Sequence, residues 1–212
     1  MTPLKKYAVV FFLISLLTLI LSSCSGVPVL NVNYRSPVKA APLEGIKVFL
    51  EIRDSRTDRE IFGEGAKEDF LNAPETISLS VAEGNEKGFK IGLFPIDELM
   101  QEIFRERLRC LGLEVNTVLN NKGDEPVVVI DLQTFKLDLT KGTVKRTWTA
   151  GMAYSVEISD KGKVLAGTRI SGQSEKMKII RRKEADSLMS DLVTDLANRL
   201  DAAALFRQAG LI

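Results

Sequence analysis

The sequence predicts an α+β fold: an antiparallel sheet of about four to five strands, mixed at one edge, with two amphipathic helices packed on one face. Three observations support this prediction. Apolar residues alternate with polar ones in several short segments, and in two longer segments they recur every three or four positions. These segments follow one another in the order β-(β)-α-β-β-β-α, and no internal repeat divides them.

The first half of the domain is predicted to hold two strands and one helix. A helix is expected to start near Asp97, a capping residue that follows Pro95, and to end at Gly112. Its apolar stripe consists of Ile96, Met100, Ile103, Phe104, Leu108 and Leu111. The alternating strand positions are Ile46, Val48, Leu50 and Ile52, followed by Ile77, Leu79 and Val81 in a short edge strand.

The second half is predicted to hold three antiparallel strands and a long helix. Residues 126–139 change the parity of their apolar positions near Gln133, which predicts a β-bulge. The next strand lies within 144–158, and "SDKGK" forms a hairpin turn into 164–173. The final helix has one apolar stripe, formed by Leu188, Met189, Leu192, Val193, Leu196, Leu200 and Ala203.

The N-terminal residues predict an exported chain. Lys5 and Lys6 precede an apolar run at 8–20, and small residues follow, which is the layout of a secretory signal peptide at 1–23. The run is shorter than the roughly 20 residues of a membrane-spanning helix. Leu21-Ser22-Ser23-Cys24 resembles the lipobox of bacterial lipoproteins, in which the cysteine receives a diacylglyceryl group and becomes the new N-terminus.

Cys24 is therefore the predicted lipidation site and membrane anchor, since several acyl chains on one residue give lasting attachment. Ser25, where inner-membrane lipoproteins of enterobacteria carry Asp, favours the periplasmic face of the outer membrane. Residues 24–45, with three prolines, are expected to form the lipidated Cys and an extended tether, and 46–212 a single periplasmic domain. The other cysteine, Cys110, is expected to be a buried structural thiol.

Composition limits the chemistry. The chain contains no histidine, which excludes Ser-His-Asp and Cys-His catalysis and the commonest zinc ligand sets. Without the two signal-peptide lysines, 27 of the 29 basic residues remain against 28 acidic ones, so the mature chain has a net charge of about −1. Such a balance gives no strong electrostatic attraction to nucleic acid. Gly63 and Gly65 lack the sequence context of a phosphate-binding loop. We expect no cofactor and no metal.

Two clusters of charged residues are candidate contact sites. Arg181, Arg182 and Lys183 stand at the start of the final helix, where cations oppose the helix dipole, so they are candidate contacts for an anion such as a lipid headgroup or for an acidic partner. The alternative is a solvated turn balanced by nearby carboxylates. The acidic pairs Asp54/Asp58 and Asp191/Asp195 are candidates for acid–base catalysis, which in glycosidases uses two carboxylates at a set separation. Asp191 and Asp195, however, lie one turn apart on the polar side of a helix, where charged residues are ordinary.

The sequence also resembles the YajG family of bacterial outer-membrane lipoproteins. The similarity lies in "FLEIRDSRTD" (49–58), the helix at 98–115, the segment 137–158 and the ending 187–208, in the family's order. The family has no agreed catalytic residues, so the resemblance implies a role only for Cys24. Arg56-Thr57-Asp58 and Gly142 resemble recurrent family positions, but turn formation explains both, with Gly142 expected to have a positive φ in a hairpin.

Together these features predict a non-enzymatic, lipid-anchored envelope protein that binds a protein or glycan through its sheet or an edge strand. The partner and the oligomeric state are left open. One alternative is an auxiliary lipoprotein of an envelope lipid or ABC-type transport system, by analogy of element order. The other is a cell-wall or lipid hydrolase that uses carboxylates alone, for which an acidic concave cleft is the expected sign.

Overall fold

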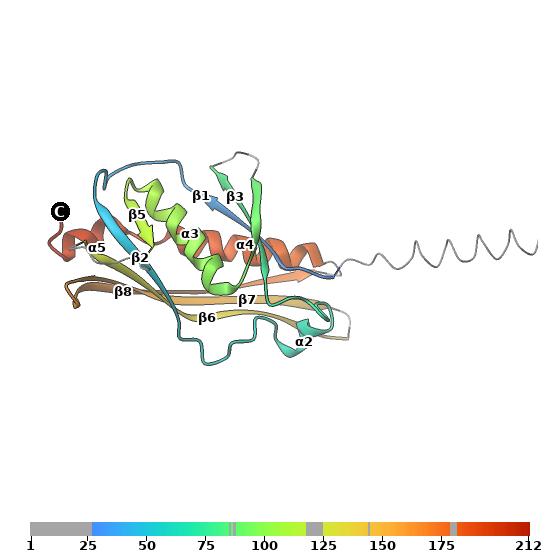
Figure 1. The fold of residues 1–212 in the computed structure, drawn as a ribbon. Helices are drawn as coiled ribbons and strands as arrows, with labels where there is room; N and C mark the ends of the chain where they lie inside the picture. Colours follow the sequence, from blue (N-terminus) through green and yellow to red (C-terminus); the bar gives the residue numbers. More distant parts are fainter. Residues whose placement is uncertain (1–26, 85, 87, 118–124, 144, 179–181) are drawn as a thin grey trace, which may run out of the picture.

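The fold comprises two β-sheets with helices between and beside them (Figure 1). The computed structural model describes residues 27–84, 86, 88–117, 125–143, 145–178 and 182–212. A five-stranded sheet has the order β5-β2-β6-β7-β8, and a three-stranded sheet has the order β1-β3-β4. The strands are β1 (Asn31–Ser36), β2 (Lys47–Asp54), β3 (Ile77–Glu83), β4 (Phe89–Phe94), β5 (Glu114–Thr117), β6 (Val127–Lys141), β7 (Arg146–Asp160) and β8 (Lys163–Lys178). The helices are α2 (Glu64–Lys67), α3 (Ile96–Cys110), α4 (Arg182–Asn198) and α5 (Ala202–Gln208).

The three long strands β6, β7 and β8 form the predicted antiparallel meander. The expected bulge is confirmed, because the register of β6 against β7 shifts between Leu132 and Thr134. Lys161 and Gly162 both have positive φ in the β7–β8 turn, as a two-residue hairpin requires. At the other side of β6, the first predicted strand, β2, runs parallel to both β6 and β5, so the sheet is mixed. The predicted α+β class is confirmed.

Both amphipathic helices cover one face of the large sheet, as expected. Tyr154 of β7 lies between them: its ring packs edge-on against Phe104 of α3 with centroids 4.9 Å apart, and its hydroxyl donates a 2.7 Å hydrogen bond to the Leu196 carbonyl of α4. All three residues are fully buried. Among the described residues, no helix has the length and apolar composition needed to cross a bilayer.

The N-terminal tether is shorter than predicted. Residues 31–36, expected to be part of an extended tether, form β1, which pairs in parallel with β3. Leu30, Val32 and Tyr34 are buried, so the folded domain begins by Leu30 and not at Ile46. The reason is that the alternating apolar residues of this segment complete the second sheet, while the prolines lie just outside the strand, at positions 28 and 37.

The outer edge of β1 is bonded to α4 instead of to another strand. The backbone N–H groups of Asn31 and Asn33 donate 2.9 Å hydrogen bonds to the Asp186 carboxylate and the Ser190 hydroxyl. Arg35 N–H donates to Thr194 Oγ1 at 3.2 Å, and Asn198 Nδ2 donates to the Arg35 carbonyl at 2.9 Å. Two residues of strand advance about 6.6 Å and four residues of helix about 6.0 Å, so the two rows stay in register.

The helix ends show where the predictions succeed and fail. Gly112 ends α3 as predicted, with φ +94° and the paired hydrogen bonds Gly112 N–H to Arg109 O and Leu113 N–H to Leu108 O. Asp97 does not cap α3, because Pro95 occupies that position. The expected single C-terminal helix is two helices: α4 ends at Asn198, and the Asp201 side chain caps α5 by accepting from Ala204 N–H.

Two further details differ from the sequence-based expectations. Gly142 lies between β6 and β7 but does not have the positive φ predicted for it. β4 and β5 were not expected. β4 was missed although Phe89, Ile91 and Leu93 alternate with other residues, and β5 was missed because it has only four residues.

Candidate functional site

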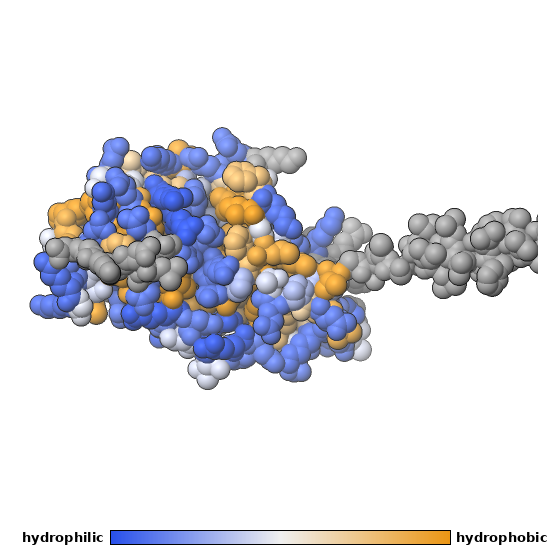
Figure 2. All heavy atoms as spheres, in the orientation of Figure 1, coloured by the Kyte–Doolittle hydropathy of each residue, from blue (hydrophilic) through white to orange (hydrophobic). Residues whose placement is uncertain are grey.

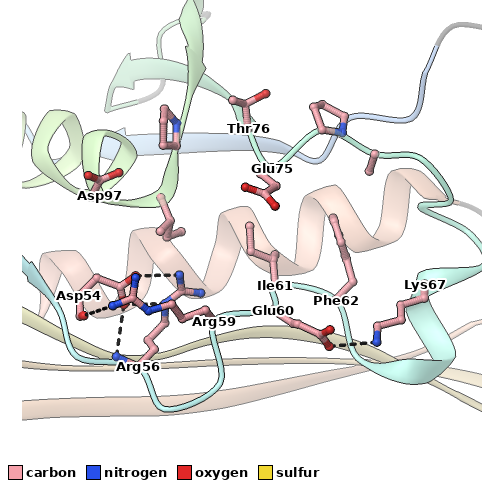
Figure 3. Close-up of a pocket in the computed structure, with 14 residues that line it drawn as sticks. Asp54, Arg56, Arg59, Glu60, Ile61, Phe62, Lys67, Glu75, Thr76 and Asp97 are labelled. Atoms are coloured by element: carbon pink, nitrogen blue, oxygen red, sulfur yellow. Dashed lines mark hydrogen bonds and ion pairs between the residues drawn. The ribbon is translucent and has the colours of Figure 1, made fainter.

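A pocket of about 660 Å³ lies where the chain leaves β2 and where it enters β3 and α3 (Figure 3). Three segments line it: the loop from Asp54 to Phe62 with Lys67 of α2, residues 73–76 before β3, and residues 95–97 at the start of α3. Its volume is in the range of small-molecule sites. The lining combines apolar side chains with charged groups of both signs.

An ion pair fixes the loop that forms the floor of the pocket. Arg56 Nε and Nη2 donate to the two carboxylate oxygens of Asp54 at 2.8 and 3.0 Å, and Arg56 N–H donates to the same carboxylate. The Arg56 side chain is only 3% exposed. These hydrogen bonds from Arg56 hold the pKa of Asp54 below its usual value. The third guanidinium nitrogen, Arg56 Nη1, is buried without a hydrogen-bond partner among the described residues.

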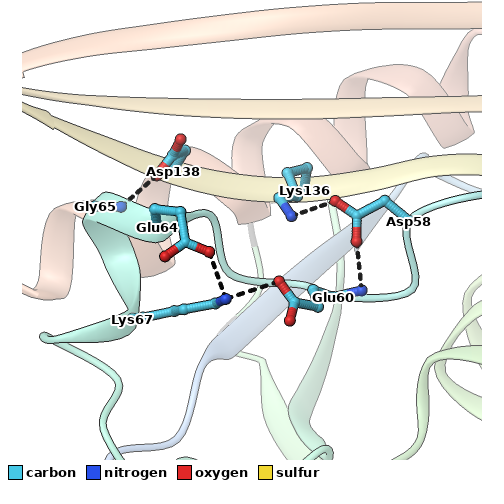
Figure 4. Close-up of polar contacts among 7 residues, drawn as sticks. All are labelled: Asp58, Glu60, Glu64, Gly65, Lys67, Lys136 and Asp138. Atoms are coloured by element: carbon cyan, nitrogen blue, oxygen red, sulfur yellow. Dashed lines mark hydrogen bonds and ion pairs between the residues drawn. The ribbon is translucent and has the colours of Figure 1, made fainter.

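A second set of polar contacts holds the rim of the pocket against the sheet (Figure 4). Lys67 bridges Glu60 and Glu64 at 3.0 and 2.6 Å, and these hydrogen bonds raise its pKa. Asp58 accepts from Lys136 Nζ of β6 at 2.6 Å and from Glu60 N–H at 3.0 Å. The loop after β2 is therefore tied to α2 and to β6 by charged groups that already have partners.

These contacts limit what the pocket can do chemically. A catalytic proton donor needs a carboxyl whose pKa is raised, whereas the pKa of Asp54 is lowered. The other carboxylates of the lining are Glu60, which is paired with Lys67, and the exposed Glu75 and Asp97. No group of three or more potential metal ligands occurs among the described residues. Asp54 is therefore suited to holding Arg56 and not to donating a proton.

The second candidate surface is the edge strand β4. Every second residue of β4 is a large, exposed apolar side chain: Phe89 is 70% exposed, Ile91 43% and Leu93 50%. Figure 2 shows hydrophobic atoms gathered over this strand. β4 is the last strand of its sheet, so in the described part of the chain its outer backbone edge has no neighbouring strand. A row of exposed apolar side chains beside an unpaired edge is typical of a protein-binding surface.

The predicted contact residues are only partly covered by the structure. Cys24 and Arg181 lie outside the described residues, as does the signal-peptide segment. Arg182 is the first residue of α4, and Lys183, which follows it, is exposed. The proposed anion contact of the three residues therefore stays a prediction.

The acidic pairs are not brought together as sites. Asp54 and Asp58 bind different partners, Arg56 and Lys136. Asp195 pairs at 2.6 Å with Arg199, which directly follows α4, and Asp191 accepts from Ser187. Cys110 is buried, as predicted, and burial raises the pKa of its thiol.

Sequence reasoning predicted binding through the sheet or an edge strand, but it located neither the pocket nor β4. The pocket joins three segments that are separated by up to about 40 positions, and no local pattern reveals such a junction. The β4 row had a local signal, the alternation of Phe89, Ile91 and Leu93, but alternation alone does not tell which face is exposed.

No known protein family and no curated protein sequence matches the chain. Among solved structures, it is similar to the crystal structure of a DUF330 protein from Xanthomonas campestris, with a TM-score of 0.53 and 9% identity over 87% of this chain and 97% of that one. It is also similar to a minor lipoprotein from Acinetobacter baumannii, with a TM-score of 0.40 and 12% identity over 78% of this chain and 91% of that one. The rare lipoprotein B from Shewanella oneidensis gives a TM-score of 0.38 and 12% identity over 77% and 98%.

At these identities the similarity concerns the fold alone. The chain shares its α+β fold with a DUF330 protein and resembles solved structures of bacterial lipoproteins.

Proposed function

We propose that the chain is a lipid-anchored lipoprotein of the bacterial cell envelope, of the YajG type, that acts as a non-enzymatic binding module for another envelope component. The signal-peptide pattern and the lipobox-like Leu21–Cys24 segment support the anchor, and Ser25 supports the periplasmic face of the outer membrane. The partner is a protein or a glycan of the envelope.

The observation that carries the binding role is the β4 edge. Phe89, Ile91 and Leu93 are exposed to water, although burial of such side chains is what stabilises a fold. Exposed edge strands also carry unpaired N–H and C=O groups, and natural proteins usually protect them. The opposite end of the same sheet illustrates such protection, because α4 covers the edge of β1 with four polar side chains. The unprotected β4 edge therefore fits a partner that adds a strand or packs on the row.

Site-specific photo-crosslinking in intact cells tests this role. A photoreactive residue is placed at Ile91, and in a matched control at Thr168, which is exposed on β8, an edge strand of the other sheet. We expect a discrete crosslinked product from position 91 that is absent from position 168. Replacement of both Phe89 and Leu93 by Ser should abolish it. Equal products from both positions, or none from position 91, would refute binding through β4.

The carboxylate-lined pocket is the observation that favours a hydrolase. The ion pairs of Asp54 and Glu60 argue against it, which leaves Glu75 and Asp97 as candidates. We expect no release of soluble fragments from purified peptidoglycan or of fatty acid from phospholipid vesicles by the purified protein. Release that is lost in a Glu75→Gln, Asp97→Asn double variant would replace the binding proposal with an enzymatic one.

A further inference from the structure

We infer that one end of the domain rests on the bilayer and binds anionic phospholipid headgroups. This anchor end, as we call it, is where β6 and β8 finish and where β1, β7 and α4 begin; its cationic positions are Lys141, Lys145, Arg146, Lys176, Lys178 and Lys183. The inference rests on the proposed lipidation of Cys24 and adds an orientation and a ligand class to it.

The elements of the anchor end lie together in the structure. Asn31, the first residue of β1, donates from its backbone N–H to Asp186 in the first turns of α4. Ser187 of α4 accepts a 3.2 Å hydrogen bond from Lys176 Nζ of β8. In the sheet register, Lys178 is opposite Arg146, and Arg146 is opposite Lys141. In Figure 1 this is the end of the domain where the described chain begins, just before β1.

The length of the N-terminal segment limits the distance between this end and the membrane. Leu30 is buried, and it lies only six positions after Cys24. A chain of six residues spans at most about 20 Å. The 15-residue strand β7 is about 50 Å long, so the Lys161–Gly162 turn that follows it lies about 50 Å from the anchor end.

The charge at the anchor end indicates what this end contacts. Lys141 and Arg146 are opposite each other on adjacent strands, and like charges at such positions destabilise a sheet. Glu68 pairs with Lys141, and Asp69 lies 4.0 Å from Arg146. Lys145 and Lys183 are exposed, and in the described part of the chain neither has a carboxylate at ion-pair distance.

An anionic lipid surface supplies a partner for Lys145 and Lys183, because basic residues next to a membrane anchor are attracted to acidic headgroups. Two apolar side chains add to the fit. Val27, the first described residue, is 58% exposed, and Leu71 is 66% exposed. Leu71 follows Phe70, whose ring contacts Trp148, the residue opposite Lys176 in the register. Such side chains beside cations suit the interface between headgroups and acyl chains.

The upright orientation also leaves the β4 row free for a partner. The competing arrangement places the domain on its side, with Phe89, Ile91 and Leu93 in the bilayer. The two arrangements differ in which residues approach the headgroups, so they can be separated by one measurement.

The experiment uses the mature, natively acylated protein in vesicles of equal parts phosphatidylethanolamine and phosphatidylglycerol that contain headgroup-nitroxide lipid. A fluorophore is attached to a single introduced cysteine: Thr143→Cys at the anchor end, Lys163→Cys at the far hairpin, or Lys90→Cys on β4. Cys110 is buried and does not compete for the label. We expect loss of fluorescence at position 143 and none at positions 90 and 163.

Charge dependence identifies the ligand. A Lys145→Gln, Lys183→Gln double variant, or exchange of the phosphatidylglycerol for phosphatidylcholine, should reduce the quenching at position 143. The matched Lys163→Gln variant should not change it. Three results would overturn this inference while leaving the proposed function intact: stronger quenching at position 90 than at position 143, equal quenching at all positions, or quenching that does not depend on lipid charge. Mass spectrometry of the same sample showing an unmodified Cys24 would instead overturn the proposed function on which it rests.

Discussion

The Ser190 hydroxyl of α4 accepts a 2.9 Å hydrogen bond from the backbone N–H of Asn33 in the middle of β1. It stands in a row of four polar side chains, spaced four residues apart, that satisfies the outer edge of the strand. The row ties the first strand of the domain to its main C-terminal helix, about 150 residues away in the chain. Any pull on the N-terminal segment is therefore transmitted to α4 and the large sheet.

Replacing Ser190 with Ala should lower the free energy of unfolding by about 1 kcal/mol, since a part-buried N–H loses its acceptor. Amide hydrogen exchange at Asn33 should accelerate selectively. Ser187→Ala is the matched control on the same helix, because its hydroxyl contacts Lys176 and not β1. Equal exchange at Asn33 in both variants would show that the row does not hold the strand.

Replacing Arg107 with Met should destabilise the domain by about 2–3 kcal/mol. This buried guanidinium of α3 donates to the carbonyl oxygens of Leu200 at 2.8 Å and Asn198 at 3.3 Å, at the C-terminus of α4. Met keeps the apolar packing but leaves both carbonyls without their donor. Chemical denaturation of Arg105→Met, which breaks only a contact within α3, provides the comparison and should show a loss below about 0.5 kcal/mol.

Replacing Gly112 with Ala should cost about 3 kcal/mol, because two penalties combine. The residue has φ +94°, and a Cβ there would lie 2.9 Å from the backbone N of Glu44 and 3.1 Å from Ala41 Cα. Gly162→Ala separates the two penalties, since Gly162 has φ +78° but open space around it. The melting temperature of the Gly112 variant should fall further. Equal decreases in melting temperature for the two variants would mean that the segment before β2 moves away from the new Cβ at no cost in stability.

Replacing Asp54 with Asn should destabilise the protein at pH 7 by about 2–3 kcal/mol, because Arg56 is left buried without its carboxylate. The pKa of Asp54 is lower in the folded state, so the ion pair adds stability above the unfolded-state pKa of about 4. This contribution is lost as the pH falls from there through the lower folded-state pKa. The difference between variant and wild type should therefore shrink in acid.

Thermal unfolding at a series of pH values measures this convergence. Asp58→Asn serves as the control, because the Asp58 carboxylate that pairs with Lys136 is exposed to solvent. The loss of stability at pH 7 should therefore be smaller for this variant. If the destabilisation of Asp54→Asn relative to wild type does not change with pH, the charge of the Asp54 carboxylate is not what holds the loop.

The parts of the fold that were predictable are those where one segment carries its own pattern. The alternation in β6 and β7 and the stripe of α3 identify buried faces directly, and Gly112 marks a helix end that requires a positive φ. β1 carried the same kind of signal at Leu30, Val32 and Tyr34. Its flanking prolines favoured the interpretation as a tether, and its partners lie about 45 and 155 residues away.

The candidate sites depend on such distant partners and were not predictable. The pocket floor requires Arg56 to turn back on Asp54, and the same loop is tied to β6 by a contact between Asp58 and Lys136, which are 78 positions apart in the sequence. The β4 row is visible in the sequence, but its exposure follows from its place at the end of the three-stranded sheet. The anchor end gathers cations from β6, β7 and β8, which the sheet register brings together, and from α4, whose Ser187 accepts a hydrogen bond from Lys176 of β8.

Mass spectrometry of the N-terminal peptide of the protein purified from membranes tests the central claim most directly. A lipid-anchored envelope module predicts a mature chain that begins at Cys24 and carries diacylglyceryl on its sulfur. A chain that begins elsewhere, or a free thiol at Cys24, would contradict the account.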